Sequence, residues 1–307
     1  MKVQIFGSNG YIGKNFTHFL SSSGVNLELF DIQETSFHSN IKYTQTDISD
    51  KGQISKINFD SDFIVIFSGL TGTSIGFQKY EEYLKVNELG LLNILDELKN
   101  QNYSGRIIFP STRLVYKGKK DTPLEEDSEK EFKTPYAMNK YACENYIKMY
   151  SNLYGLNFTI FRICVPYGNL AGNDYSYGTV GFFLNKSLKK ENITLFGDGS
   201  QKRTFTEISD LCRVLLSGMQ SEKTLNGIFN IGGETFSLYE AAKIVGEKFN
   251  VGIDLIDWPE TDIKLESGDT IFNSDKLDAK LNYEYKGNFK KWVSDLKKPA
   301  ENPPAKL

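Results

Sequence analysis

Cysteine and histidine are scarce in this chain of 307 residues. The three cysteines, Cys143, Cys164 and Cys212, are far apart in the sequence and form no close pair. This spacing argues against a disulfide framework and is typical of a protein kept in a reducing compartment. The two histidines, His18 and His38, cannot build a convincing metal cluster with these cysteines. We therefore expect neither structural disulfides nor a metal site.

The chain also lacks an excess of charge of one sign and a long apolar run. Lys and Arg number 36 and Asp and Glu number 39, which gives a net charge of -3 and no general attraction to nucleic acid or to an anionic membrane. A strand pattern over Lys2–Phe6 leaves no room for a signal peptide, and no later segment is long and apolar enough to span a bilayer. We expect a soluble cytoplasmic protein that binds neither nucleic acid nor membranes. Residues 298–307 carry three prolines and are predicted to be a flexible tail.

The N-terminus carries a glycine motif between a predicted strand and a predicted helix. An apolar run over Val3–Phe6 is followed by a G-x-x-G-x-x-G loop and by a helical pattern that reaches Leu20. Glycines at this place let the backbone approach a pyrophosphate that sits at the helix N-terminus. We predict a dinucleotide-binding turn whose cofactor contacts are Gly7, Asn9, Gly10, Tyr11, Ile12 and Gly13.

The next predicted strand, over Asn26–Phe30, ends at Asp31. An acidic side chain there can accept hydrogen bonds from the adenosine ribose and would repel a 2′-phosphate, so NAD is favoured over NADP. Five more residues follow or flank later strands and are predicted to line the cofactor site: Asp47, Ile48, Ser68, Gly69 and Asn87.

Strands and helices alternate along the first half of the chain, which predicts an α/β fold with a doubly wound parallel (Rossmann) sheet. Predicted strands cover 41–45, 63–67, 106–109 and 158–163, and a long helix covers 80–99. Beyond residue 165 the pattern loosens into a turn at 165–168, a polar loop at 169–179 and shorter elements. We therefore expect an NAD-binding domain at 1–165 and a smaller α/β substrate domain at 166–297, with 228–233 returning to the main sheet.

Tyr136 and Lys140 lie four residues apart in a predicted helix over Pro135–Tyr154, so both side chains lie on the same face. Thr134 is suited to cap this helix and Gly155 to end it. An ammonium close to a phenol favours the phenolate and lowers the phenol pKa from about 10. We predict that Tyr136 acts as a general base on a sugar hydroxyl.

Taken together and in order, these motifs resemble the extended short-chain dehydrogenase/reductase family, in particular its NAD-dependent nucleotide-sugar epimerases and dehydratases. The resemblance rests on the glycine loop, on Asp31, on Thr112 before Val115-Tyr116, and on Tyr136 with Lys140. The G-D-G-x-x-x-R-x-F segment at 197–205 and the F-N-I-G strand at 229–232 extend it over residues 1–297.

The resemblance implies roles for individual residues. Tyr136 would be the catalytic acid and base, Lys140 would tune it and hold the nicotinamide ribose, and Thr112 would bind the reacting hydroxyl. Arg203 would clamp the substrate diphosphate, and Tyr167 is included among the substrate-binding residues. The helices at 80–99 and 135–154 would pack against their copies in a homodimer.

Three departures from the family pattern bear on the substrate. The dehydratases carry Asp-Glu after the threonine, whereas this chain has Arg113-Leu114, so a 4,6-dehydratase is disfavoured. Val165 replaces a usual asparagine, and Leu265-Glu266-Ser267 stands where many relatives have an arginine for the diphosphate.

The leading hypothesis is an NAD-dependent nucleotide-sugar 4-epimerase of the UDP-hexose type, acting through a transient 4-keto sugar. The alternative is an NAD(P)H-dependent 4-keto-6-deoxysugar reductase, because the same three residues serve both reactions. A non-catalytic dinucleotide sensor is a third hypothesis, which the presence of both Tyr136 and Lys140 disfavours.

Overall fold

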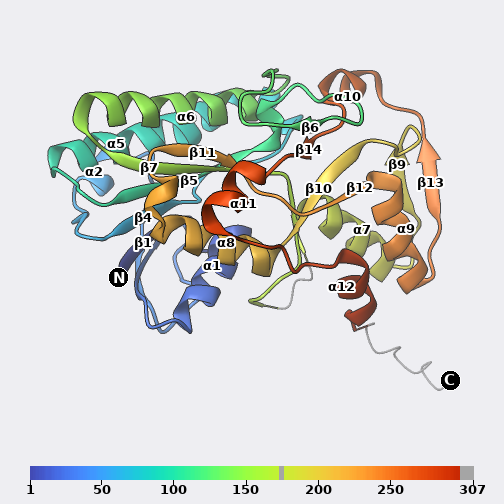
Figure 1. The fold of residues 1–307 in the computed structure, drawn as a ribbon, viewed down its shortest axis with the longest axis horizontal. Coiled ribbons are helices and arrows are strands. Elements are labelled where there is room, and N and C mark those ends of the chain that lie inside the picture. The colour runs from blue at the N-terminus through green and yellow to red at the C-terminus, as the bar shows by residue number, and fades with distance from the viewer. Residues whose placement is uncertain (173–175, 298–307) are drawn as a thin grey trace.

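The computed structural model describes residues 1–172 and 176–297 (Figure 1). The predicted flexible tail at 298–307 lies outside these residues, as does the middle of the predicted loop at 169–179. Within the described part of the chain, no helix has both the length and the apolar character needed to cross a membrane.

A seven-stranded sheet forms the larger half of the molecule, and every neighbouring pair of strands is parallel. Its order is β11-β7-β5-β4-β1-β2-β3, which confirms the predicted doubly wound fold. The strands are β1 (Lys2–Phe6), β2 (Asn26–Asp31), β3 (Lys42–Gln45), β4 (Phe63–Ile66), β5 (Arg106–Thr112), β7 (Asn157–Ile163) and β11 (Gly227–Asn230). The direction of connection reverses between β1 and β4, and in such sheets ligands bind beyond the carboxyl ends of the strands at that point.

Helices cover both faces of this sheet, which explains why its central strand β4 is apolar and β5 is buried along its whole length (Figure 1). On one face lie α2 (Lys51–Ile54), α5 (Gly90–Asn100) and α6 (Pro135–Tyr154), which share an apolar core with the sheet. On the other lie α1 (Tyr11–Ser21), α8 (Ile208–Gln220) and α11 (Asp275–Leu281), around a second core. The C-terminal half of the chain thus contributes strand β11 to the main sheet, and its helices α8 and α11 pack against that sheet.

The helix predicted over 80–99 is present but is not regular. It consists of α4 (Tyr80–Tyr83), a π-helical segment η1 (Leu84–Leu89) and α5, and a short helix α3 (Ile75–Gln78) precedes it. Asn87 lies inside the π segment and is buried. Such π turns inside α-helices are frequent at functional sites, and this one brings Asn87 to the loop after β4.

Helix α6 has the bounds that the sequence predicts, because both of its ends are chemically specified. The Thr134 side chain accepts a hydrogen bond from the backbone of Ala137 at 3.1 Å, and Pro135 occupies the first turn. Gly155 ends the helix in the left-handed conformation, at φ 73°.

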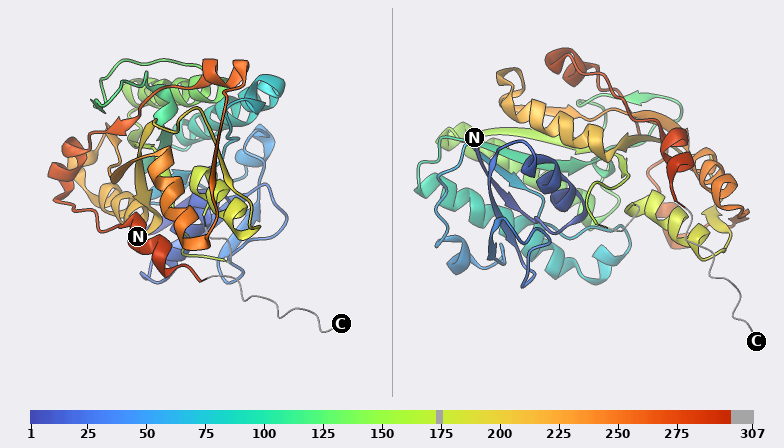
Figure 2. Two further views of the ribbon diagram at one scale, coloured as in Figure 1. Left: turned by 90° about the vertical axis from the view of Figure 1, so that its right-hand side faces the viewer. Right: turned by 90° about the horizontal axis from the view of Figure 1, so that it is seen from below.

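The smaller half is built around three short sheets and its own apolar core (Figure 2). The sheets pair β8 (Val165–Tyr167) with β10 (Lys202–Glu207) and β12 (Glu234–Ser237), β9 (Ile193–Phe196) with β13 (Ile253–Ile256), and β6 (Pro123–Leu124) with β14 (Ile271–Phe272). Its helices are α7 (Gly178–Leu188), α9 (Leu238–Phe249), α10 (Glu260–Leu265) and α12 (Phe289–Asp295), and two single turns, η2 (Arg113–Val115) and η3 (Glu222–Thr224), complete the described elements.

One predicted element of this half is wrong. The sequence predicts a turn over 165–168, yet residues 165–167 form strand β8, which pairs in parallel with β10. The pairing partner lies some forty residues further along the chain, so local turn propensity could not reveal it. The turn itself is confined to Gly168, at φ 90°.

Candidate active site

The glycine loop joins β1 to α1 at the point where the sheet reverses its order. Gly7 has φ 80°, and a Cβ there would lie 2.4 Å from the backbone nitrogen of Ser68. A Cβ on Gly13 would lie 2.1 Å from the Gly7 carbonyl oxygen, whereas one on Gly10 meets only that oxygen, at 3.4 Å. Gly7 and Gly13 thus allow close backbone packing, and Gly10 faces open space at the N-terminus of α1. These are the features of a turn built to receive a pyrophosphate.

Asp31 is buried at the end of β2 and is bonded to the same loop. One carboxylate oxygen accepts a hydrogen bond from the backbone of Asn9 at 2.9 Å, and the other accepts one from Gln33 at 3.2 Å. The side chain of Asn9 in turn accepts from the backbone of Phe37 at 2.8 Å. Asp31 therefore fixes the loop, and its predicted contact with the adenosine ribose stays a prediction.

The other predicted cofactor residues frame the same edge of the sheet. Asp47 accepts hydrogen bonds from the backbone and hydroxyl of Ser49, and buried Ile48 packs against Gly90. Asn87 holds the bend that follows β4: its side-chain oxygen accepts from the Leu70 backbone at 2.7 Å, and its nitrogen donates to the Leu70 carbonyl at 3.1 Å. Asn87 thereby fixes the backbone next to Gly69, which lines the cavity, whereas neither Asn87 nor Ser68 is among the lining residues.

A cavity of about 430 Å³ opens at this edge, and the three predicted catalytic residues line it. Thr112 ends β5, while Tyr136 and Lys140 come from the first turns of α6. The cavity is also lined by Gly10, Tyr11, Ile12, Gly13 and Gly69 from the predicted cofactor site. The structure thus brings together the glycine loop and the Tyr-Lys pair, which are more than a hundred residues apart in the sequence.

The electrostatics of the Tyr-Lys pair differ from the prediction. Burial raises the pKa of the Tyr136 phenol, and contact with the Thr112 side chain only partly offsets this. Burial also lowers the pKa of Lys140 to about 8. The Lys140 ammonium donates to the Pro110 carbonyl at 2.9 Å and lies 4.3 Å from the centre of the Phe109 ring. The predicted fall in the Tyr136 pKa is therefore absent from the protein alone, because desolvation outweighs the hydrogen bond with Thr112.

Two predicted substrate residues do not reach the cavity. Arg203 is 2% exposed, and its guanidinium donates to Glu266 at 2.5 Å and to the carbonyls of Gly268 and Lys202. Tyr167 is fully buried in the core of the smaller half, where its ring packs on Phe289. Both side chains already contact other residues of the protein. Their contacts with substrate stay predictions, and they would require these side chains to move.

Other residues line the cavity without having been predicted. Tyr177 stacks on Tyr11 with ring centres 5.3 Å apart, and its hydroxyl lies 2.8 Å from that of Thr71, which also lines the cavity. Arg113 and Cys164 line the side toward the smaller half. The tyrosines in the loop at 169–179 could have indicated Tyr177 as a binding residue. Arg113 is notable in the sequence only because it departs from a family motif.

The residues of the cavity fit a dinucleotide. Besides the open space over Gly10, the buried hydroxyl of Ser111 lines the cavity and has no hydrogen-bond partner among the described residues. A buried polar atom of this kind costs free energy unless a ligand or water satisfies it. In contrast, no group of three or more His, Cys, Asp or Glu within residues 1–172 and 176–297 could hold a metal ion.

A doubly wound sheet, a glycine loop at its switch point and a Tyr-Lys pair beside it define a dinucleotide-dependent enzyme. The model of the NAD dependent epimerase/dehydratase family matches residues 3–232, and the chain belongs to this family. The protein is therefore an enzyme of this family, and its cofactor is NAD.

Individual relatives agree with this assignment. The chain is 25% identical to a CDP-paratose 2-epimerase of Salmonella typhi, over 84% of this chain and 88% of the relative. It is 26% identical to a UDP-glucuronate 4-epimerase of Thermodesulfobacterium geofontis, over 75% of this chain and 74% of the relative. The fold matches that of a Thermus thermophilus UDP-glucose 4-epimerase solved with NAD, with a TM-score of 0.85, 22% identity and coverage of 96% of this chain and 97% of that one.

Proposed function

We propose that the protein is a nucleotide-sugar 4-epimerase of the UDP-hexose type, acting through a transient 4-keto sugar. The observation that carries this proposal is the composition of the cavity. Thr112, Tyr136 and Lys140 line it together, and none of its described lining residues is an Asp or a Glu. A 4,6-dehydratase needs a further acid and base to eliminate water, so the cavity supports hydroxyl oxidation and reduction without elimination.

Each of the three catalytic residues would have its own role in the reaction. Tyr136 removes the proton from the C4 hydroxyl and later returns it, while the Thr112 hydroxyl orients that group. Lys140 holds its positive charge near Tyr136 and binds the ribose of the cofactor. NAD, when bound, would supply the hydride acceptor and donor and a positive charge that favours the Tyr136 phenolate, which burial in the protein alone disfavours.

The cofactor would lie along the loop at 7–13, with Asp31 at the ribose and Asp47 with Ile48 toward the adenine. Support for a nucleotide sugar as the substrate comes from the relatives, which are named for CDP-paratose, UDP-glucuronate and UDP-glucose. Residues 166–297 would contribute most of the substrate contacts. A cytoplasmic location fits three cysteines that are all free in the structure.

The test is an assay of the purified protein with UDP-glucose and with UDP-galactose, in the absence of added cofactor. We expect about one NAD per chain to survive gel filtration and the two sugars to interconvert. A protein that binds reduced cofactor reversibly and interconverts neither sugar would contradict the epimerase and favour a 4-keto reductase.

We further propose a homodimer formed through α6 and the helix at 80–100. The support is an apolar surface on these two helices, which lie side by side on one face of the sheet (Figure 1). Its exposed side chains are Leu84, Leu89, Met138, Met149, Leu153 and Tyr154. Exposed apolar patches of this kind are typical of protein-protein interfaces.

A further inference from the structure

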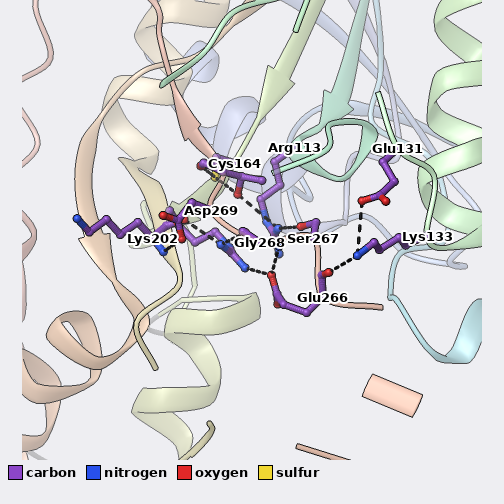
Figure 3. A network of polar contacts seen from close by, with 11 residues as sticks. Arg113, Glu131, Lys133, Cys164, Lys202, Glu266, Ser267, Gly268 and Asp269 are labelled. Carbon is purple, nitrogen blue, oxygen red and sulfur yellow. Dashed lines mark hydrogen bonds and ion pairs between the residues drawn. The ribbon is translucent and has the colours of Figure 1, made fainter. Parts of the chain in front are cut away.

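The described residues that line the cavity include two cations, Lys140 and Arg113, and no carboxylate. Lys140 is bonded to the Pro110 carbonyl and serves the Tyr136 pair in the proposed function. Arg113 is the residue directly after Thr112, in the single turn η2 that follows β5. Its side chain belongs to a network of hydrogen bonds and ion pairs that includes Ser267 and Glu266 (Figure 3).

Within that network, Arg203 is paired with a carboxylate. Its guanidinium forms an ion pair with Glu266 and donates to the carbonyls of Lys202 and Gly268. Glu266 occupies the segment where a diphosphate-binding arginine is common in the family, so this chain has a carboxylate there that neutralises Arg203. The pair leaves no net positive charge at the place where the resemblance expected the substrate diphosphate.

Arg113 is the exception in the network. Its guanidinium donates to two neutral hydroxyls, Ser267 at 3.1 Å and Thr270 at 3.5 Å, and no ion pair joins it to a carboxylate in the described part of the chain (Figure 3). Both bonds come from one terminal nitrogen, so the remaining N–H donors of the guanidinium have no hydrogen-bond partner among the described residues, and Arg113 lines the cavity.

The Arg113 side chain is partly buried and lines the cavity close to a second guanidinium, that of Arg203. Burial and the neighbouring Arg203 guanidinium lower the pKa of Arg113 to about 10. Buried charges are usually paired, because an unpaired one loses its hydration without compensation. The charge is therefore better explained by a ligand than by a contribution to stability.

We propose that Arg113, and not Arg203, binds an oxyanion of the substrate in this cavity. The inference rests on the proposed function for the identity of the substrate as a nucleotide sugar. Two groups of such a molecule share the chemistry that a planar guanidinium recognises: the diphosphate, and a carboxylate on the sugar ring. Arg113 is thus a specificity-determining residue next to the catalytic threonine.

The test measures binding by calorimetry, on NAD-loaded protein, with UDP, UDP-glucose and UDP-glucuronate as probes. Arg113→Met removes the charge and keeps the length of the side chain, and Arg113→Lys keeps the charge. The matched control is Lys202→Met, which removes a cation of the same network whose side chain is half exposed and paired with Asp121. Retained NAD and the melting temperature confirm that each variant is folded.

We expect Arg113→Met to weaken binding about 10- to 100-fold, as the loss of a charge-assisted hydrogen bond does. Arg113→Lys should lose less, and Lys202→Met should change binding less than about twofold. Weakened binding of all three probes identifies the diphosphate as the bound anion. A loss confined to UDP-glucuronate identifies the sugar carboxylate.

Equal binding by wild type, Arg113→Met and Lys202→Met would overturn the inference, whether or not the enzyme turns over. Loss of binding in Arg113→Met without any sugar interconversion by the wild type would keep the inference and contradict the proposed function. If the wild type binds none of the three probes at millimolar concentration, both are wrong.

Discussion

The phenol of Tyr136 carries the proposed chemistry, although the protein alone holds it in the neutral form. Its pKa is raised by burial, and Lys140 is bonded to a backbone carbonyl instead of lying free beneath it. The sequence predicts that both residues line one cavity, because the i, i+4 spacing on a helix fixes their common face. It does not predict the sign of the pKa shift, which depends on desolvation by residues from other elements.

Removing the phenol hydroxyl tests this role. We expect Tyr136→Phe to lower turnover by at least ~100-fold, because general acid-base catalysis contributes this much or more. NAD content should stay near that of the wild type, since the ring remains in place. The control is Tyr141→Phe on the same helix, whose ring packs on Phe132. Equal turnover by Tyr136→Phe and the control would mean that the phenol does no chemistry.

At the scale of elements, the sequence predicts those parts whose ends carry local signals. The glycine loop and helix α6, with Thr134 and Gly155 at its ends, both have the predicted place. The π segment in the helix at 80–100 and strand β8 escaped prediction, because both depend on contacts with distant parts of the chain. The same holds for Arg203. The sequence motif identifies this residue, but it does not predict the ion pair with Glu266, which is a tertiary contact.

The π segment gives a prediction about cofactor binding. Asn87→Ala removes both hydrogen bonds to Leu70, so we expect a loss of about 1–3 kcal/mol in stability and a lower content of retained NAD. Thermal unfolding and nucleotide extraction measure the two effects.

Gln101→Ala is the matched control for this variant. Gln101 lies at the other end of α5, and its amide clamps the backbone of Ile57 and Phe59 in the same way, away from the cavity. It should cost similar stability and leave NAD in place. An equal loss of NAD from both variants would show that Asn87 acts through stability alone.

At the scale of the whole molecule, the sequence predicts one large sheet with a smaller half, and the structure has both. It does not predict that α8 and α11 pack on the main sheet, because their apolar faces would suit either half. The cavity lies where the two halves meet, so its lining could not be read from either half alone.

The proposed dimer is tested at this scale. We expect light scattering to give a mass near that of two chains. The double variant Met149→Glu with Leu153→Glu should have a mass closer to that of one chain, because it places carboxylates in the apolar interface. Leu153 is 71% exposed, so the change does not disturb the core. Phe182→Glu, an exposed apolar residue on α7, is the control. A wild-type mass near one chain at micromolar concentration would remove the dimer.

The central claim is that one carbon of the sugar is oxidised and then reduced in the same cavity. Its most direct test uses UDP-glucose with deuterium at C4 and NAD-loaded protein, without added cofactor. The account predicts UDP-galactose that keeps the deuterium at C4, because the carbon-bound hydrogen moves to the cofactor and returns without exchange with water. Failure to form UDP-galactose, or loss of the label to solvent, would contradict it.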